Sequence, residues 1–73
     1  MKVSIEYCGQ WNYYDRAAGL AAKFKEKFSA ETELIESGGG VYEVVVDGRL
    51  IYSKRATGEF PNEEVLLRGL NSW

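Results

Sequence analysis

The sequence predicts an α/β protein built on a mixed sheet, with its elements in the order strand, helix, strand, strand, strand, helix. Residues 2–7 alternate between polar and apolar side chains, and residues 41–46 are rich in valine, which is typical of strands. Between residues 12 and 28, apolar residues recur every three or four positions and indicate a helix. A helix between the first two strands makes a crossover, so we expect these strands to lie parallel, with helices packed on the sheet.

The first helix is predicted to begin near residue 12. Asn12 or Asp15 is expected to cap it, and Asp15 also places negative charge near the positive end of the helix dipole. Gly19 lies in its middle, where glycine costs about 1 kcal/mol relative to alanine, so we expect a neighbouring element to approach closely there. The apolar stripe of this helix comprises Ala17, Leu20, Ala21, Phe24 and Phe28.

Three further strands are expected after this helix. Residues 32–36 predict a weaker strand, which Gly38-Gly39-Gly40 ends. Residues 41–46 predict a strong strand, and Asp47-Gly48 directly after it is a hairpin signal, since both residues tolerate positive φ. Residues 49–53 are therefore expected to return antiparallel to it.

The chain is predicted to close with a loop and a second helix. Residues 54–59 are polar and contain Gly58, which favours a loop. Phe60-Pro61-Asn62 opens the helix, with Asn62 as its expected cap. The buried stripe of this helix is expected to comprise Leu66, Leu67, Leu70 and Trp73.

Length and composition indicate one globular domain over residues 1–73. The chain is 45% hydrophobic and 27% charged, as in soluble globular proteins. It contains no run of about 18 apolar residues that could span a bilayer, and its N-terminus lacks the apolar stretch of a signal peptide. Nothing in its cysteine usage requires an oxidising compartment, so we expect a cytoplasmic location.

The residue counts exclude several kinds of chemistry. The chain has no histidine, which removes every Ser–His and Cys–His nucleophile. One cysteine without histidine excludes a structural zinc site, and one cysteine cannot form an internal disulfide. The net charge of −2 argues against nucleic acid or an anionic membrane as the main partner.

Cys8 is the candidate catalytic residue. It falls at the end of the first predicted strand and just before the first helix, where backbone N–H groups and the positive end of the helix dipole converge. A thiolate placed there is stabilised, and the thiolate is the reactive form of cysteine. The alternative is a buried and inert cysteine, because free cysteine is among the most buried residue types.

The residues after Cys8 are the candidate binding residues, namely Gly9, Gln10, Trp11 and Tyr14. The aromatic side chains here form either a rim that holds a partner or part of the core. Trp11, Tyr13 and Tyr14 cannot all face one core from adjacent positions of a helical turn, so at least one should be exposed.

Other patterns in the chain favour structural roles. The glycines at 38–40 lack the lysine and serine or threonine of a phosphate loop, and no helix opens after them, so a flexible connection is expected. Lys54 and Arg55 are expected to be solvated surface residues. The glutamates at 31, 33 and 36 show no pairing typical of a glycosidase, and no metal site is expected.

The run Ile5-Glu6-Tyr7-Cys8-Gly9 resembles the selenoprotein W-like family, which also contains selenoproteins T and H. So do the stretch from Gly39 to Lys54 and the run Gly58-Glu59-Phe60-Pro61 before the closing helix. The resemblance spans nearly the whole chain. It implies a thioredoxin-like fold, a β-α-β-β-β-α two-layer sandwich, and a thiol redox role in a Cys-x-x-Cys or Cys-x-x-selenocysteine loop.

The chain departs from this pattern at one redox position. Cys8 matches the first, but the second falls on Trp11, which cannot attack a mixed disulfide. The resemblance then implies that an external thiol such as glutathione resolves the mixed disulfide on Cys8, and no other cofactor is expected. Two functions stay open: a monothiol redox protein, and a non-catalytic protein-interaction module on a thioredoxin-like scaffold.

Overall fold

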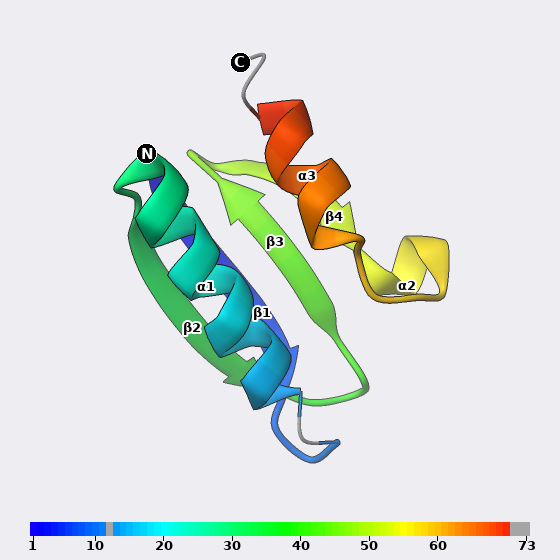
Figure 1. The fold of residues 1–73 in the computed structure, drawn as a ribbon. Coiled ribbons are helices and arrows are strands. Elements are labelled where there is room, and N and C mark those ends of the chain that lie inside the picture. The colour runs from blue at the N-terminus through cyan, green and yellow to red at the C-terminus, as the bar shows by residue number, and fades with distance from the viewer. Residues whose placement is uncertain (12, 71–73) are drawn as a thin grey trace.

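A computed structural model describes residues 1–11 and 13–70 as one four-stranded sheet with helices (Figure 1). The predicted element order is confirmed, with one short helix added. The cap expected of Asn12 and the buried contact expected of Trp73 lie outside the described residues. The elements are β1 (Lys2–Cys8), α1 (Tyr14–Phe28), β2 (Glu31–Ser37), β3 (Tyr42–Val46), β4 (Arg49–Ser53), α2 (Lys54–Thr57) and α3 (Glu63–Leu70).

The sheet has the strand order β2-β1-β3-β4 and is mixed, as predicted. β1 and β2 are parallel because α1 carries the chain back between them. β3 pairs antiparallel with both β1 and β4. This topology puts β1 in the middle of the sheet, and its last residue is Cys8.

One face of the sheet is covered by α1 and α3, which both lie in front of it in Figure 1. Ile5 pairs with Val44 and Tyr7 pairs with Tyr42, so these side chains of the two central strands lie on one face, toward the helices. Along this face the strands and helices form one hydrophobic cluster, which includes Leu20, Phe24, Leu67 and Leu70.

The hairpin between β3 and β4 forms at the predicted place. Asp47 and Gly48 have φ values of 51° and 81°, the positive values that a tight two-residue turn requires. The Asp47 carboxylate accepts a hydrogen bond from the backbone N–H of Lys2 at 2.8 Å, which ties the turn to the start of β1. The register shifts between Val44 and Val45, and the extra residue on β4, Ile51, packs against the core.

The helix α1 buries the predicted stripe, with Ala17, Leu20 and Phe24 inside the core. The expectation for Gly19 is wrong, because a Cβ built on it meets nothing within 4 Å. Gly19 lies on the exposed side of α1, where no neighbouring element requires a glycine.

The expected loop after β4 is wrong in part, because residues 54–57 form the single-turn helix α2. Gly58 ends this turn with a φ of 81°. The Tyr52 hydroxyl contacts the Thr57 hydroxyl at 2.8 Å and donates to the Glu59 carbonyl at 2.6 Å. These side-chain hydrogen bonds hold a segment that is too short to form a helix alone.

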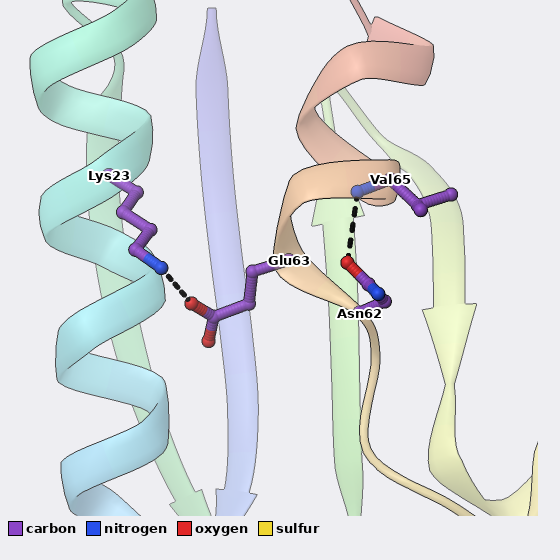
Figure 2. A network of polar contacts seen from close by, with 4 residues as sticks. All are labelled: Lys23, Asn62, Glu63 and Val65. Carbon is purple, nitrogen blue, oxygen red and sulfur yellow. Dashed lines mark hydrogen bonds and ion pairs between the residues drawn. The ribbon is translucent and has the colours of Figure 1, made fainter.

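The last helix, α3, begins as predicted. The side-chain oxygen of Asn62 accepts the backbone N–H of Val65 at 3.2 Å (Figure 2). In the same view, the Lys23 ammonium of α1 donates to the Glu63 carboxylate of α3 at 2.6 Å. This hydrogen bond is the main reason that the pKa of Lys23 is raised. It joins the two helices that cover the sheet.

Candidate functional site

The backbone fixes Cys8 between the sheet and the first helix. Cys8 pairs with Ser37 at the end of β1 and β2, and Gly9 donates its N–H to the Ser37 carbonyl at 3.0 Å. The Cys8 carbonyl accepts the N–H of Tyr13, the N-cap residue of α1, at 3.3 Å. The predicted position of the cysteine at a strand-to-helix turn is therefore the one that the structure has.

The Cys8 side chain is fully covered, with 0% of its surface exposed. It does not belong to the main hydrophobic cluster, and alternation along β1 assigns it to the face opposite Tyr7. A reagent in solution reaches such a sulfur only when the residues that cover it move. The Cys8 backbone thus lies beside the start of α1, while its side chain is covered outside the main hydrophobic cluster.

The start of α1 carries no side-chain cap among the described residues. Tyr13 occupies the N-cap position without a side-chain hydrogen bond, and Asp15 lies inside the first turn instead of capping it. The first N–H groups of the helix therefore keep their positive partial charge close to the turn that begins at Cys8.

Trp11 lies three residues after Cys8 along the chain. Its side chain is 62% exposed, yet one edge of the ring lies on Gly40 in the β2–β3 loop. A Cβ on Gly40 would come within 2.7 Å of Trp11 Cζ3, and Gly40 has a φ of 72°. Both the backbone conformation and the close ring therefore require glycine at position 40.

A carboxylate lies on the β2 side of the same turn. A Cβ on Gly9 would come within 2.7 Å of Glu36 Cδ, so the Glu36 side chain lies directly against this glycine. Burial, followed by the charge of Glu36, raises the pKa of Tyr7. Tyr7 also meets the ring of Tyr14 edge-on at 5.7 Å.

The opposite side of the turn carries an aromatic cluster with cations. Tyr13 meets Phe60 edge-on at 4.7 Å, and Phe60 meets Tyr42 at 5.1 Å. The Arg16 guanidinium lies 4.1 Å from the centre of the Phe60 ring, and the Lys54 ammonium lies 5.3 Å from it. Cations at these distances are attracted by the ring faces.

Tyr42 is fully buried in this cluster. Its hydroxyl has no hydrogen-bond partner among residues 1–11 and 13–70. Burial raises the pKa of Tyr42 strongly, the charge of Glu63 adds to this, and Arg16 opposes it. The phenol is therefore held in its neutral form.

The predicted site residues are brought together in one turn and the adjoining helix start. Gly9 is half-buried, Gln10 is exposed, and Tyr14 is 50% exposed, so the expectation of an exposed aromatic residue is confirmed. Sequence reasoning missed the contributions of Phe60, Arg16 and Glu36, which come from other elements. Phe60 before Pro61 was the available signal, since a large apolar residue in a loop needs cover.

Two expected absences concern metals and membranes. Within residues 1–11 and 13–70, no group of three or more metal-ligating side chains converges on one point. Each helix that the structure describes is too short or too polar to cross a bilayer.

The fold and the site define a class, small thioredoxin-like α+β proteins with a cysteine at the end of the first strand. A selenoprotein W-related protein from Vibrio cholerae has the same fold, with a TM-score of 0.87 and 28% identity over 97% of this chain and 92% of that one. A protein from Bordetella parapertussis gives a TM-score of 0.82 and 27% identity over 97% and 94% of the two chains. The thioredoxin-like fold implied by the resemblance is confirmed.

The chain belongs to the Rdx family, whose description matches residues 2–72. Migration and invasion enhancer 1 from Bos taurus is 30% identical over 71 residues, and the protein of that name from Mus musculus is 30% identical over 69 residues. These matches cover 96% and 93% of this chain but 62% and 60% of the relatives. The chain therefore spans less than two thirds of the length of these two relatives.

Proposed function

We propose that the chain is a thiol redox protein in which Cys8 acts as a single nucleophile. The observation that supports this is the place of Cys8, which ends β1 while its carbonyl bonds to the N-cap residue of α1. The N-terminus of α1, where the Tyr13 side chain makes no capping hydrogen bond, favours negative charge at this turn. Membership of the Rdx family adds support, because the resemblance to selenoprotein W-like proteins implies that Cys8 is the first redox position.

The exchange needs a disulfide and an external thiol. The Cys8 thiolate attacks one sulfur of the disulfide, a new S–S bond forms, and the other sulfur leaves as a thiolate. When the disulfide joins a substrate cysteine to glutathione, the substrate leaves reduced and Cys8 carries the glutathione. A second glutathione thiolate then attacks that mixed disulfide, which releases Cys8 as a thiolate and yields glutathione disulfide. In the net reaction, the substrate–glutathione disulfide and one glutathione thiol become a substrate thiol and glutathione disulfide, so no other reductant is needed.

Access to the sulfur requires local movement of the residues that cover it, and the turn after Cys8 is the segment that we expect to move. Cys8 has no exposed surface, so attack in the closed state is blocked. The backbone bonds that close the turn are Gly9 to Ser37 and Tyr13 to Cys8, at 3.0 and 3.3 Å. Breaking two bonds near the surface costs less than global unfolding, and such segments open locally.

The direct test follows the removal of glutathione from a glutathionylated peptide in the presence of glutathione. The chain is expected to accelerate this reaction, and mass spectrometry is expected to find one glutathione on Cys8 during turnover. A Cys8→Ser variant serves as the control. A rate equal to that of the control, with no adduct on Cys8, would rule out the thiol function.

A second candidate is a binding module without turnover, favoured by the exposure of Trp11 and Tyr14, at 62% and 50%. Tyrosine and tryptophan are common anchors at protein interfaces. Under this function, a bound partner stays bound when Cys8 is replaced by serine, and the glutathione assay shows no acceleration.

A further inference from the structure

One end of the molecule carries a surface of rings and cations that takes no part in the thiol exchange. The end of the β1–α1 turn, the first turn of α1, α2 and the segment before α3 all lie at the end of the sheet where β1 finishes (Figure 1). We call this region the basic aromatic surface. It consists of Trp11, Tyr13, Arg16, Lys54, Arg55 and Phe60.

The rings of this surface hold the cations in defined places. Arg16 lies 4.1 Å from the Phe60 ring centre, and Lys54 lies 5.7 Å from that of Tyr13. Arg55 extends over the neighbouring loop, where its Nη2 would be 3.2 Å from a Cβ on Gly39. An aromatic face positions a cation without neutralising it, so the positive charge stays available to a partner.

These three cations lack carboxylate partners. In the part of the chain that the structure describes, Arg16, Lys54 and Arg55 form no ion pair within 4 Å. By contrast, the Lys23 ammonium on α1 forms an ion pair with the Glu63 carboxylate at 2.6 Å. Asp15 and Glu59 lie in the same segments, and within the described residues neither is within 4 Å of these cations. The three cations are thus gathered at one end of a chain whose net charge is −2.

Trp11 gives this surface a fixed apolar anchor. The ring is 62% exposed while one edge rests on Gly40, and it meets Tyr13 edge-on at 6.2 Å. A ring that is held in place before binding loses little conformational entropy when a partner covers it. Tryptophan and arginine are the residue types that most often dominate binding energies.

We propose that the basic aromatic surface docks an acidic segment of a partner protein, with an apolar side chain of that segment against Trp11. Charge complementarity selects the acidic partner, since three cations without ion pairs among the described residues lie on the rings and the loop next to Trp11. This inference rests on the second candidate function, to which it adds the chemistry of the partner. It does not depend on the reactivity of Cys8.

The test uses two synthetic eight-residue peptides. In one, glutamate alternates with leucine and phenylalanine, and in the other each glutamate is replaced by lysine. The chain has two tryptophans, so a Trp73→Phe variant reports on Trp11 alone through its fluorescence. The acidic peptide is expected to change the Trp11 emission saturably at low salt, with weaker binding as salt increases, whereas the lysine peptide is expected to have no effect.

Charge removal then locates the site. A Lys54→Gln and Arg55→Gln double variant is expected to bind the acidic peptide about tenfold more weakly, the loss of two exposed charge pairs. The matched control, Lys25→Gln with Lys27→Gln, removes two exposed cations from the last turn of α1, at the other end of the helix (Figure 1). This control is expected to bind as the parent does.

Three outcomes would overturn the proposal: no saturable binding of the acidic peptide, equal binding of both peptides, or equal losses in the two double variants. A Cys8→Ser variant is expected to keep the acidic peptide bound. Peptide binding therefore reports on docking, while the glutathione assay reports on the thiol, and either can fail without the other.

Discussion

The Tyr42 side chain stabilises the fold through its buried ring and destabilises it through its unpaired hydroxyl. Its ring fills the space between Tyr13 and Phe60, at 6.4 and 5.1 Å, and its whole surface is buried. Its hydroxyl has no partner among the described residues, and a buried polar group without a hydrogen bond costs about 1–3 kcal/mol. The aromatic cluster beside the site is therefore less stable than its packing alone would make it.

Replacing Tyr42 with phenylalanine is expected to raise the free energy of unfolding by about 1 kcal/mol, because the ring stays and the unpaired hydroxyl goes. Because the pKa of Tyr42 is raised in the folded state, the unfolded chain releases this proton first as the pH rises. The free energy of unfolding is therefore unaffected by this ionisation below pH about 10 and decreases above it. The variant is therefore expected to lose stability less steeply in alkali. Urea unfolding at pH 7 and pH 11 checks both points, and a variant less stable at pH 7 would contradict them.

At this scale the sequence predicts what depends on neighbours along the chain. The cap at Asn62 and the turn at Asp47-Gly48 follow from local chemistry, and both are confirmed. The contact between Trp11 and Gly40 is different, because it joins two loops far apart in the sequence. No local pattern encodes such a contact, and it needs the sheet order to be known first.

At the scale of elements, α1 is regular except for Gly19, where no tertiary contact explains the glycine. Gly19→Ala is expected to stabilise the chain by about 0.8 kcal/mol through helix propensity. Thermal or urea unfolding measures this effect. Gly58→Ala is a matched control, since its Cβ also meets nothing within 4 Å but its φ is 81°, so it is expected to destabilise. Equal effects of the two substitutions would contradict this account.

The turn between β1 and α1 depends on the β2–β3 loop. Gly40→Ala is expected to destabilise the chain by about 1–2 kcal/mol and to move the Trp11 ring, because Gly40 has a φ of 72° and lies against that ring. Gly48→Ala imposes a similar backbone cost at a φ of 81° with no side chain nearby. In the Trp73→Phe background, only Gly40→Ala should change the Trp11 emission. An unchanged emission would show that the ring does not rest on this glycine.

Helix α2 is the element that the sequence pattern does not predict. A four-residue helix has too few positions for a periodic pattern, and Gly58 correctly signals an end without signalling what precedes it. Its stability depends on the hydrogen bonds of Tyr52 with Thr57 and Glu59, side-chain contacts that leave no periodic pattern in the sequence. This helix also carries Lys54 and Arg55, so the missed element supplies part of the basic aromatic surface.

For the whole molecule, the sequence predicts the topology well because the connections determine it. A helix between β1 and β2 makes them parallel, and a two-residue turn makes β3 and β4 antiparallel. The candidate site is predicted in part. Cys8 and the turn after it follow from their order in the chain, while the complete burial of Cys8 depends on how all elements pack.

The rate at which an alkylating reagent labels Cys8 in the native protein tests the central claim most directly. If the residues that cover Cys8 open locally, labelling is independent of global stability, and the Gly19→Ala variant labels at the parent's rate. If the sulfur is reached only by global unfolding, that variant labels about fourfold more slowly, in proportion to its added stability of about 0.8 kcal/mol. We predict equal rates. A rate that falls with increasing stability would show Cys8 to be a structural residue and would contradict the thiol function.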